Sequence, residues 1–451
     1  MKTLIKGGVL VNEGGMARGD ILIADDLISS ISKYEDTPDS SCLAADADAV
    51  VDATDCYVMP GVIDTHVHFR EPGLTEKADM ESESRAAAAG GVTSFLEMPN
   101  TVPQTTTPKA LDEKFVLAAR KSHVNYSFFF GATNDNAGLF ARLDGRHIPG
   151  IKLFMGSSTG NMLVEGDTAL ERVFSECSRL HLPLMAHCED TAIISRNMAD
   201  ACSRYGDDPP VRLHPLIRSE EACMASTAKA VRLARRHHTR LHVAHVSTAA
   251  ELEMFAPYDT QITAEATVGH LLFTHADYER LGTRIKVNPA IKSDSDRQAL
   301  LRGLTDGRIA TVATDHAPHL LSQKEGGCRR AASGMPMVQF SLPAMLGLVD
   351  NGQLTLPWLV ELMCHRPATL FGILQRGFLR EGFKADLAIV RPRCPWTLTP
   401  DIIESRCQWS PLEGQTFQWR VEQTLCNGRT VYQYGTTARP YAGEALTFNH
   451  P

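Results

Sequence analysis

The sequence predicts an α/β protein built on a (β/α)8 barrel, and three observations favour this fold. Short apolar runs recur along the middle of the 451-residue chain, with helical patterns between several of them. Most of these runs are almost continuously apolar, as expected of parallel strands that are buried on both faces. The chain also has a suitable length for a barrel with an accessory domain. A doubly wound open sheet is the alternative that the same alternation leaves open.

The predicted barrel strands number eight, as a closed (β/α)8 barrel requires. Each is bounded by a loop or by a helical pattern. They cover residues 62–68, 92–98, 125–131, 150–155, 183–187, 241–246, 261–266 and 309–314.

Four predicted helices carry recognisable start or stop signals. A side-chain oxygen before a helix satisfies its free N–H groups, proline suits the first helical position, and glycine favours the end. The helices with their signals are 79–89, which stops at Gly90–Gly91; 108–121, opened by Thr107 and Pro108; 168–181, capped by Asp167; and one from Ser219 to about 237.

Both ends of the chain are rich in short β-like runs. The hairpin signal Asn427–Gly428 lies between the last two of them. Chain termini often lie close in space, so the two ends can form one domain together. The runs are 3–5, 9–11, 20–23, 28–31 and 50–51 at the N-terminal end, and 386–390, 417–421 and 430–434 at the C-terminal end.

Composition and charge exclude several classes of function. Hydrophobic residues make up 43% and charged residues 22%, which is typical of a soluble enzyme. The net charge of −8 and the lack of a dense basic run argue against nucleic acid. No apolar run is long enough for a bilayer, and the N-terminus does not resemble a signal peptide. The 11 cysteines form no close pairs, so we expect a cytoplasmic protein in a reducing compartment.

Histidines and charged residues lie at the ends of predicted strands, where barrel active sites are found. His66 and His68 are two residues apart, so both imidazoles face the same side of one strand. A single histidine in such a place is more often a core residue. A set spread over five strands instead favours a site for Zn²⁺ or a similar divalent metal. The set is His66, His68, Lys152, His187, His245 and Asp315.

Lys152 stands in the apolar run 151–154, which favours a buried amine of depressed pKa. A neutral lysine can react with CO₂ to form a carbamate, an anionic ligand with two oxygens that can bridge two metals. The alternative, a lysine that reaches out of the barrel or pairs with an acid, stays open. Two metals would supply a metal-activated hydroxide near neutral pH and polarise a carbonyl. With Asp315 as general acid/base, the pattern predicts hydrolysis of a cyclic amide, or its reverse.

These motifs resemble the amidohydrolase superfamily, and within it the dihydroorotase family, in the branch that carries the lysine. The resemblance covers essentially the whole chain. Its most specific part is Asp64–Gly73, which is similar to the signature of that family. Three other segments are also similar to family motifs: Val58–Gly61, Met98–Thr101 and Ala313–His319.

The resemblance implies an enzyme for the reversible cyclisation of N-carbamoyl-L-aspartate to L-dihydroorotate, a small-molecule reaction of pyrimidine (UMP) biosynthesis. It implies two Zn²⁺ per subunit, bridged by carboxylated Lys152. It also implies one β-sandwich from residues 1–56 and 381–451, a barrel from 57–380, and is compatible with a homodimer. The implied roles are metal binding by His66, His68, Lys152, His187, His245 and Asp315, catalysis by Asp315, carboxylate binding by Arg70, Asn100 and His319, and ring contacts by Asn288 and Gly334.

The chain departs from the family pattern in places, and two other readings stay open. Gly269 replaces the first of two adjacent histidines, the loop 333–339 is unusual, and 157–160 is either a mobile lid or an ordinary turn. Allantoinase and dihydropyrimidinase share barrel and metals, but Arg70 and Asn100 favour a substrate with a free carboxylate. A non-catalytic scaffold relative is the alternative of another class, although such proteins typically lose metal ligands.

Overall fold

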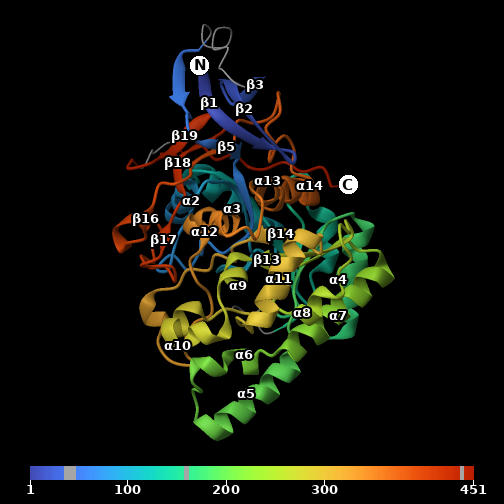
Figure 1. The fold of residues 1–451 in the computed structure, drawn as a ribbon. Helices are drawn as coiled ribbons and strands as arrows, with labels where there is room; N and C mark the ends of the chain where they lie inside the picture. Colours follow the sequence, from blue (N-terminus) through green and yellow to red (C-terminus); the bar gives the residue numbers. More distant parts are fainter. Residues whose placement is uncertain (35–46, 157–161, 437–440, 451) are drawn as a thin grey trace.

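The computed structural model describes residues 1–34, 47–156, 162–436 and 441–450. Parallel strands surrounded by helices form its centre, and the strands of the two chain ends lie together at the top of Figure 1. The segment 157–160, for which the sequence leaves a lid or a turn open, lies outside the described residues.

Eight strand positions form the barrel, as predicted. Neighbouring strands run parallel in two ladders that follow the chain order. The third position is split at Phe129, whose N–H donates to the Glu97 carbonyl. Val67 bridges His316, which joins the last strand to the first, so the sheet is closed rather than open. The strands are β6 (Val62–Val67), β7 (Val92–Glu97), β8 (Asn125–Phe128) with β9 (Phe130–Gly131), β10 (Ile151–Phe154), β11 (Leu184–His187), β12 (Leu241–Val243), β13 (Ile262–Thr267) and β14 (Ile309–Ala313).

Helices follow most of these strands, and several of their ends obey the local signals. Thr107 and Ser219 accept hydrogen bonds from Ala110 N and Ala222 N, and Gly90 ends the first helix. The helices are α2 (Met80–Ala89), α3 (Pro108–Lys121), α4 (Asp167–Arg179), α5 (Thr191–Tyr205), α6 (His214–Ile217), α7 (Glu220–His237), α8 (Ala249–Leu252), α9 (Val268–Leu272), α10 (Tyr278–Leu281), α11 (Asp294–Asp306), α12 (Ser341–Asp350), α13 (Leu356–Val360) and α14 (Arg366–Phe371).

Two local predictions are wrong, one at the start of a helix and one within a predicted strand. Asp167 is the first residue of α4 rather than its cap, and its carboxylate pairs with Lys229 at 2.8 Å. The predicted strand 417–421 is split, because Phe417 belongs to a separate two-stranded pair whereas the next strand begins at Arg420. The two-stranded pair is β16 (Trp396–Thr397) with β17 (Thr416–Phe417).

One sheet of eight strands joins the two chain ends. The first strand bulges between Ile5 and Gly8 and changes its neighbour there from β4 to β5. The sheet therefore folds around a hydrophobic cluster of its own, which includes Ile21, Ile28 and Leu387 and gives the sandwich-like packing that was predicted. The strands are β1 (Lys2–Asn12), β2 (Gly15–Ala24), β3 (Leu27–Tyr34), β4 (Ala49–Asp52), β5 (Tyr57–Pro60), β15 (Leu387–Arg391), β18 (Arg420–Cys426) and β19 (Arg429–Gln433).

The predicted hairpin joins the last two strands of this sheet. Asn427 and Gly428 have φ angles of 50° and 73°, the left-handed conformations that a two-residue hairpin turn requires. Strand β5, which covers the four residues directly after the predicted boundary at 56, also lies in the sheet. The division of the chain into domains at residues 56 and 381 stays a prediction.

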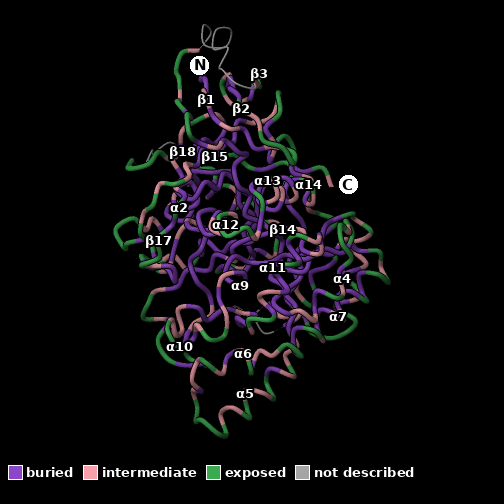
Figure 2. Tube along the Cα trace, in the orientation of Figure 1, coloured by how far each residue is buried: buried purple, intermediate pink, exposed green. Residues whose placement is uncertain are grey.

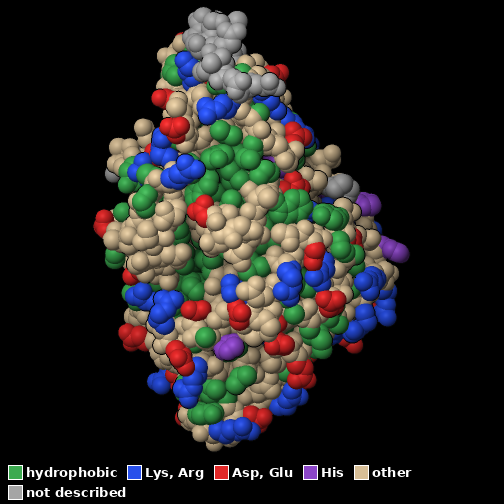
Figure 3. Space-filling view, viewed as in Figure 1, with side chains coloured by type: hydrophobic (Ala, Val, Ile, Leu, Met, Phe, Trp, Pro, Cys, Tyr) green, Lys and Arg blue, Asp and Glu red, His purple; other side chains and the backbone are tan. Residues whose placement is uncertain are grey.

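Burial follows this architecture. In Figure 2 the barrel interior is purple, whereas α5 at the bottom is mostly exposed or half-buried, with Ile194 as its buried residue. On the face shown in Figure 3, basic and acidic side chains are interspersed around hydrophobic ones. The ten cysteines of the described residues are free thiols. None of the described helices combines the length and the apolar character needed to cross a bilayer.

Candidate active site

The predicted site residues converge at the carboxyl ends of the barrel strands. Nine of the eleven line one cavity, together with Phe154, Ala317 and Ser333. Lys152 is fully buried on strand β10, and His319 lies behind Arg70. The nine are His66, His68, Arg70, Asn100, His187, His245, Asn288, Asp315 and Gly334.

His66, His68 and Asp315 form a cluster whose ligand atoms lie within 4.8 Å of one another. Asp315 Oδ1 is 3.3 Å from His66 Nε2 and 3.0 Å from His68 Nε2. Burial alone would raise the pKa of Asp315, but the two imidazoles outweigh it and hold this pKa below its usual range. The carboxylate is therefore ionised and faces two ring nitrogens.

The hydrogen bond between His66 and Glu265 determines which ring nitrogen of His66 is available to bind a metal. Its Nδ1 lies 2.8 Å from Glu265 Oε1, an ionised carboxylate that can only accept, so Nδ1 carries the hydrogen. Nε2 is then the ring nitrogen that is turned toward the Asp315 carboxylate, at 3.3 Å. A cation placed between these two atoms would be bound by both. This donor set fits a divalent metal.

The remaining candidate metal ligands, which are Lys152, His187 and His245, lie on or just after strands β10, β11 and β12. His187 Nδ1 and His245 Nε2 are 2.9 Å apart, and burial lowers the pKa of both rings, so both stay neutral near pH 7. Lys152 is 0% exposed, and its amine has no hydrogen-bond partner among the described residues. Burial lowers the pKa of Lys152 to about 8. A buried amine that lacks a hydrogen-bond partner and lies close enough to His187 and His245 to lower their pKa values fits the carbamate hypothesis.

Glu265 is a residue that the sequence analysis missed. It is fully buried in β13, and it accepts hydrogen bonds from the His66 ring, the Thr65 hydroxyl and the His245 backbone N–H. It thus fixes candidate ligands from two strands at once. The signal was available, because an acid inside an otherwise buried strand is costly unless it has such partners.

Three of the predicted residues have left-handed backbone conformations. The φ angles of Arg70, His245 and Asp315 are 68°, 39° and 49°. Such conformations cost free energy for residues with a Cβ and persist where the surrounding structure imposes them. Their occurrence at three strand ends around one cavity is typical of a functional site.

Arg70 is a buried cation without an acidic partner. It is 2% exposed, and its guanidinium donates to the Pro318 carbonyl and lies 3.1 Å from His319 Nε2. Burial lowers the pKa of Arg70 to about 10, so it remains charged near neutral pH. No described acidic side chain forms an ion pair with it. Asn100 borders the same cavity, and its Oδ1 lies 2.8 Å from His68 Nδ1.

Gly269, the departure from the family pattern, makes room for Met335. A Cβ added at Gly269 would lie 2.0 Å from Met335 Cε. Met335 is buried and directly follows Gly334 in the loop that lines the cavity. The methionine therefore fills the space that a larger residue at 269 would need.

We expect Gly269→Ala to change the free energy of unfolding by less than about 1 kcal/mol, because alanine favours helix α9 while the end of the Met335 side chain must move aside. In a Met335→Ala background the clash is absent, and the same substitution should stabilise the protein by about 0.5–1 kcal/mol. The free energy of unfolding in urea of the two single variants and the double variant measures this coupling. Equal effects of Gly269→Ala in both backgrounds would contradict the account.

Comparisons with known proteins agree with this fold. A protein-family model described as "Amidohydrolase family" matches residues 57–431. The chain is 37% identical over 435 residues to a dihydroorotase of Halobacterium salinarum, covering 94% of this chain and 98% of that protein. It is 32% identical over 454 residues to an allantoinase of Bacillus velezensis, covering 99% and 97%. The solved structure of an L-hydantoinase (dihydropyrimidinase) from Arthrobacter aurescens matches with a TM-score of 0.91 at 29% identity, over 99% of each chain.

Proposed function

Because the chain belongs to the amidohydrolase family, we propose that it is a zinc-dependent dihydroorotase, which interconverts N-carbamoyl-L-aspartate and L-dihydroorotate in pyrimidine biosynthesis. The observation that carries this choice is Arg70. A charged, buried guanidinium that borders the cavity and pairs with no acidic side chain of the described residues is stabilised by an anionic group on the substrate. Dihydroorotate carries a carboxylate beside its cyclic amide.

The alternative substrates lack that carboxylate. Allantoin and dihydrouracil are neutral rings, so binding either one would leave Arg70 without a counter-charge in a buried place. The metal site alone cannot distinguish these substrates, because bound metals would polarise the carbonyl of any of them. The cost at Arg70 gives the neutral substrates a lower affinity than dihydroorotate. The relative named allantoinase therefore makes allantoin the first compound to compare.

The metal centre is part of the proposal. His66, His68 and Asp315 would hold one Zn²⁺ and His187 and His245 a second, with carboxylated Lys152 between them. Bound there, the metals would lower the pKa of a water, provide hydroxide near neutral pH and polarise the scissile carbonyl.

The chain's own residues orient the substrate and move the proton. Arg70 and Asn100 bind the carboxylate, which places the cyclic amide over the carboxyl ends of β6 and β14. Asp315 takes a proton from the attacking water and gives it to the ring nitrogen as the C–N bond breaks. In cyclisation the same carboxylate takes the proton from the attacking nitrogen and returns it to the departing water. Glu265 keeps His66 in the tautomer that turns Nε2 toward Asp315.

Removing the metal tests the centre. We expect a chelator to abolish activity, and zinc with bicarbonate to restore it to the wild type but not to Lys152→Ala. The reason is that only the wild type can form the carbamate. Zinc content per chain and a ¹³C carbamate signal after addition of labelled bicarbonate are the measurements. A Lys152→Ala variant with full zinc and full activity would show that the amine is not a bridging ligand.

The direct test of the function follows ring opening of L-dihydroorotate in the ultraviolet with zinc-loaded, bicarbonate-treated protein. Turnover of dihydroorotate supports the proposal. Comparable turnover of allantoin or dihydrouracil would assign the neutral substrate class instead. A protein that binds no metal under any condition would support the scaffold alternative.

A further inference from the structure

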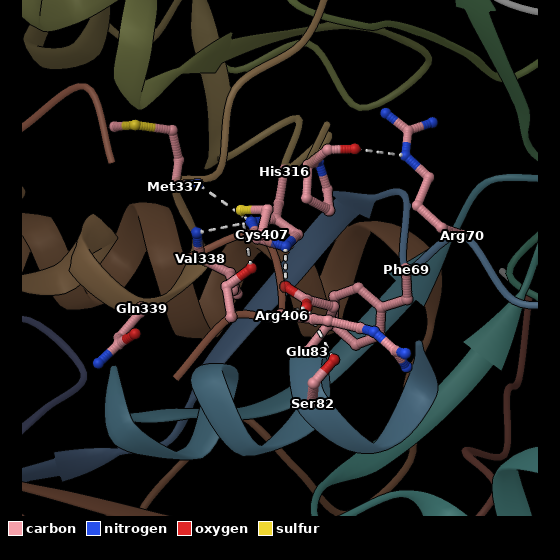
Figure 4. Close-up of polar contacts among 12 residues, drawn as sticks. Phe69, Arg70, Ser82, Glu83, His316, Met337, Val338, Gln339, Arg406 and Cys407 are labelled. Carbon is pink, nitrogen blue, oxygen red and sulfur yellow. Dashed lines mark hydrogen bonds and ion pairs between the residues drawn. The ribbon is translucent and has the colours of Figure 1, made fainter. Parts of the chain in front are cut away.

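His316, the residue after Asp315, connects four segments of the chain around the cavity. Its ring is 1% exposed and lies behind the site rather than in it. Figure 4 shows Glu83 on one side of this ring and the loop residues Met337 and Val338 on the other. Its carbonyl accepts a hydrogen bond from His68 N at 2.7 Å.

The contacts of the ring fix its tautomer. The N–H groups of Met337 and Val338 both donate to His316 Nδ1, at 3.0 and 3.2 Å, so this nitrogen carries a lone pair. Nε2 therefore carries the hydrogen and donates it to Glu83 Oε2 at 2.7 Å. A second hydrogen on Nδ1 would face the two backbone N–H groups. The ring can hold the loop only in this one state.

Glu83 anchors the ring to the first helix of the barrel. It is fully buried in α2, and its Oε1 accepts hydrogen bonds from the Ser82 hydroxyl and the Arg406 backbone N–H. Both carboxylate oxygens therefore have donors, as a buried carboxylate needs. The loop is thus tied through His316 to a rigid helix rather than to another loop (Figure 4).

The tethered loop forms part of the cavity wall. Ser333 and Gly334 line the cavity, and Met335 O accepts a hydrogen bond from Ala317 N at 3.0 Å. On its other side, Gly334 N donates to the Lys286 carbonyl at 2.8 Å. The two hydrogen bonds to the His316 ring hold the loop at Met337 and Val338, a few residues after Ser333 and Gly334, which line the cavity.

We propose that Glu83 and His316 are positioning residues, which hold the loop 333–338 over the substrate ring. This inference rests on the proposed function for its substrate and on the contacts of His316 for its geometry. Without the His316 ring the loop keeps its backbone bonds at Gly334 and Met335 but loses those at Met337 and Val338. This part of the loop must then be ordered when substrate binds, so the loss falls on binding more than on the chemical step. Neither residue lines the cavity or touches the reacting atoms.

Two substitutions at the same position separate anchoring from general packing. In His316→Asn the side-chain oxygen can lie near the place of Nδ1 and accept from the loop. In His316→Gln the amide lies near the place of Nε2 instead, and the loop loses its acceptor. We expect His316→Gln to raise KM for dihydroorotate about ten-fold with little change in kcat, and His316→Asn to recover part of that loss. Glu83→Gln should behave like His316→Gln.

His365 provides the matched control. It is also a buried histidine whose ring holds two backbone groups, the Gly377 carbonyl and the Glu13 N–H, but it contacts the terminal β1–β2 turn. His365→Gln should lower thermal stability as His316→Gln does and leave KM unchanged. Zinc content should equal that of the wild type in all variants.

Hydrogen exchange at the amides of Met337 and Val338 gives a readout that needs no substrate. We expect exchange to become about ten-fold faster in His316→Gln and to stay unchanged in His365→Gln. Unchanged exchange and KM in His316→Gln would overturn the inference, and so would faster exchange without a rise in KM or an equal rise in the control. If the wild type fails to open dihydroorotate, the proposed function fails, and the exchange data still decide whether the loop is anchored here.

Discussion

Replacing Asp315 by asparagine is expected to lower kcat for dihydroorotate by about 10³-fold or more, in both directions of the reaction. The amide keeps the shape of the side chain and one oxygen near His66 and His68, but it cannot accept and return a proton. The left-handed backbone at Asp315 is imposed by its neighbours and should survive the change. Steady-state kinetics of ring opening and ring closure measure the loss.

A buried carboxylate outside the cavity serves as control for this variant. Glu251 accepts hydrogen bonds from the hydroxyls of Thr227 and Thr248 and lies in α8. Glu251→Gln should keep kcat close to the wild-type value even if it lowers stability. An Asp315→Asn enzyme that retains most of its activity would exclude Asp315 as the general acid/base.

Replacing Arg70 by methionine is expected to lower kcat/KM for dihydroorotate by about 10²- to 10³-fold, the usual cost of removing one partner of a buried charge pair. Zinc content should stay at the wild-type level, because the guanidinium contacts Pro318 and His319 and none of the candidate metal ligands. Kinetics and metal analysis of the same preparation test both statements. Arg240→Met is the matched control, because Arg240 lies directly before strand β12, at the end of the barrel opposite the cavity, and donates to the Leu370 carbonyl. Loss of zinc in Arg70→Met would mean that Arg70 supports the metal site instead.

Much of the fold could be predicted because its signals are local. The barrel strands are apolar runs whose burial on both faces is visible in composition, and the helix starts at Thr107 and Ser219 are set by one side-chain hydrogen bond each. Local signals did not fix element ends to the residue: α4 begins one residue early, so Asp167 is its first residue. Strand β5 pairs with β1 and β15 in the terminal sheet.

The candidate metal ligands could be predicted from the sequence, whereas the residues that hold these ligands in place by hydrogen bonds were not identified. Strand ends meet at one rim of a barrel, so His66, His187 and His245 could be placed together from the order of the strands alone. The sequence shows that an acid such as Glu265 in an apolar strand needs a hydrogen-bond donor. It does not show which distant residue supplies the donor to Glu265 or to Glu83. The packing of Met335 against Gly269 likewise depends on coordinates of two loops.

The most direct test of the account compares dihydroorotate with dihydrouracil, the same ring without the carboxylate, in the wild type and in Arg70→Met. The ratio of kcat/KM for the two substrates isolates the interaction between Arg70 and that carboxylate. We predict a large preference for dihydroorotate in the wild type that nearly disappears in the variant. The slow opening of dihydrouracil should not fall and should become faster, because the variant no longer leaves an unpaired charge buried beside the neutral ring. A wild-type enzyme that opens dihydrouracil as well as dihydroorotate, or a preference that survives in Arg70→Met, would contradict the assignment of the site.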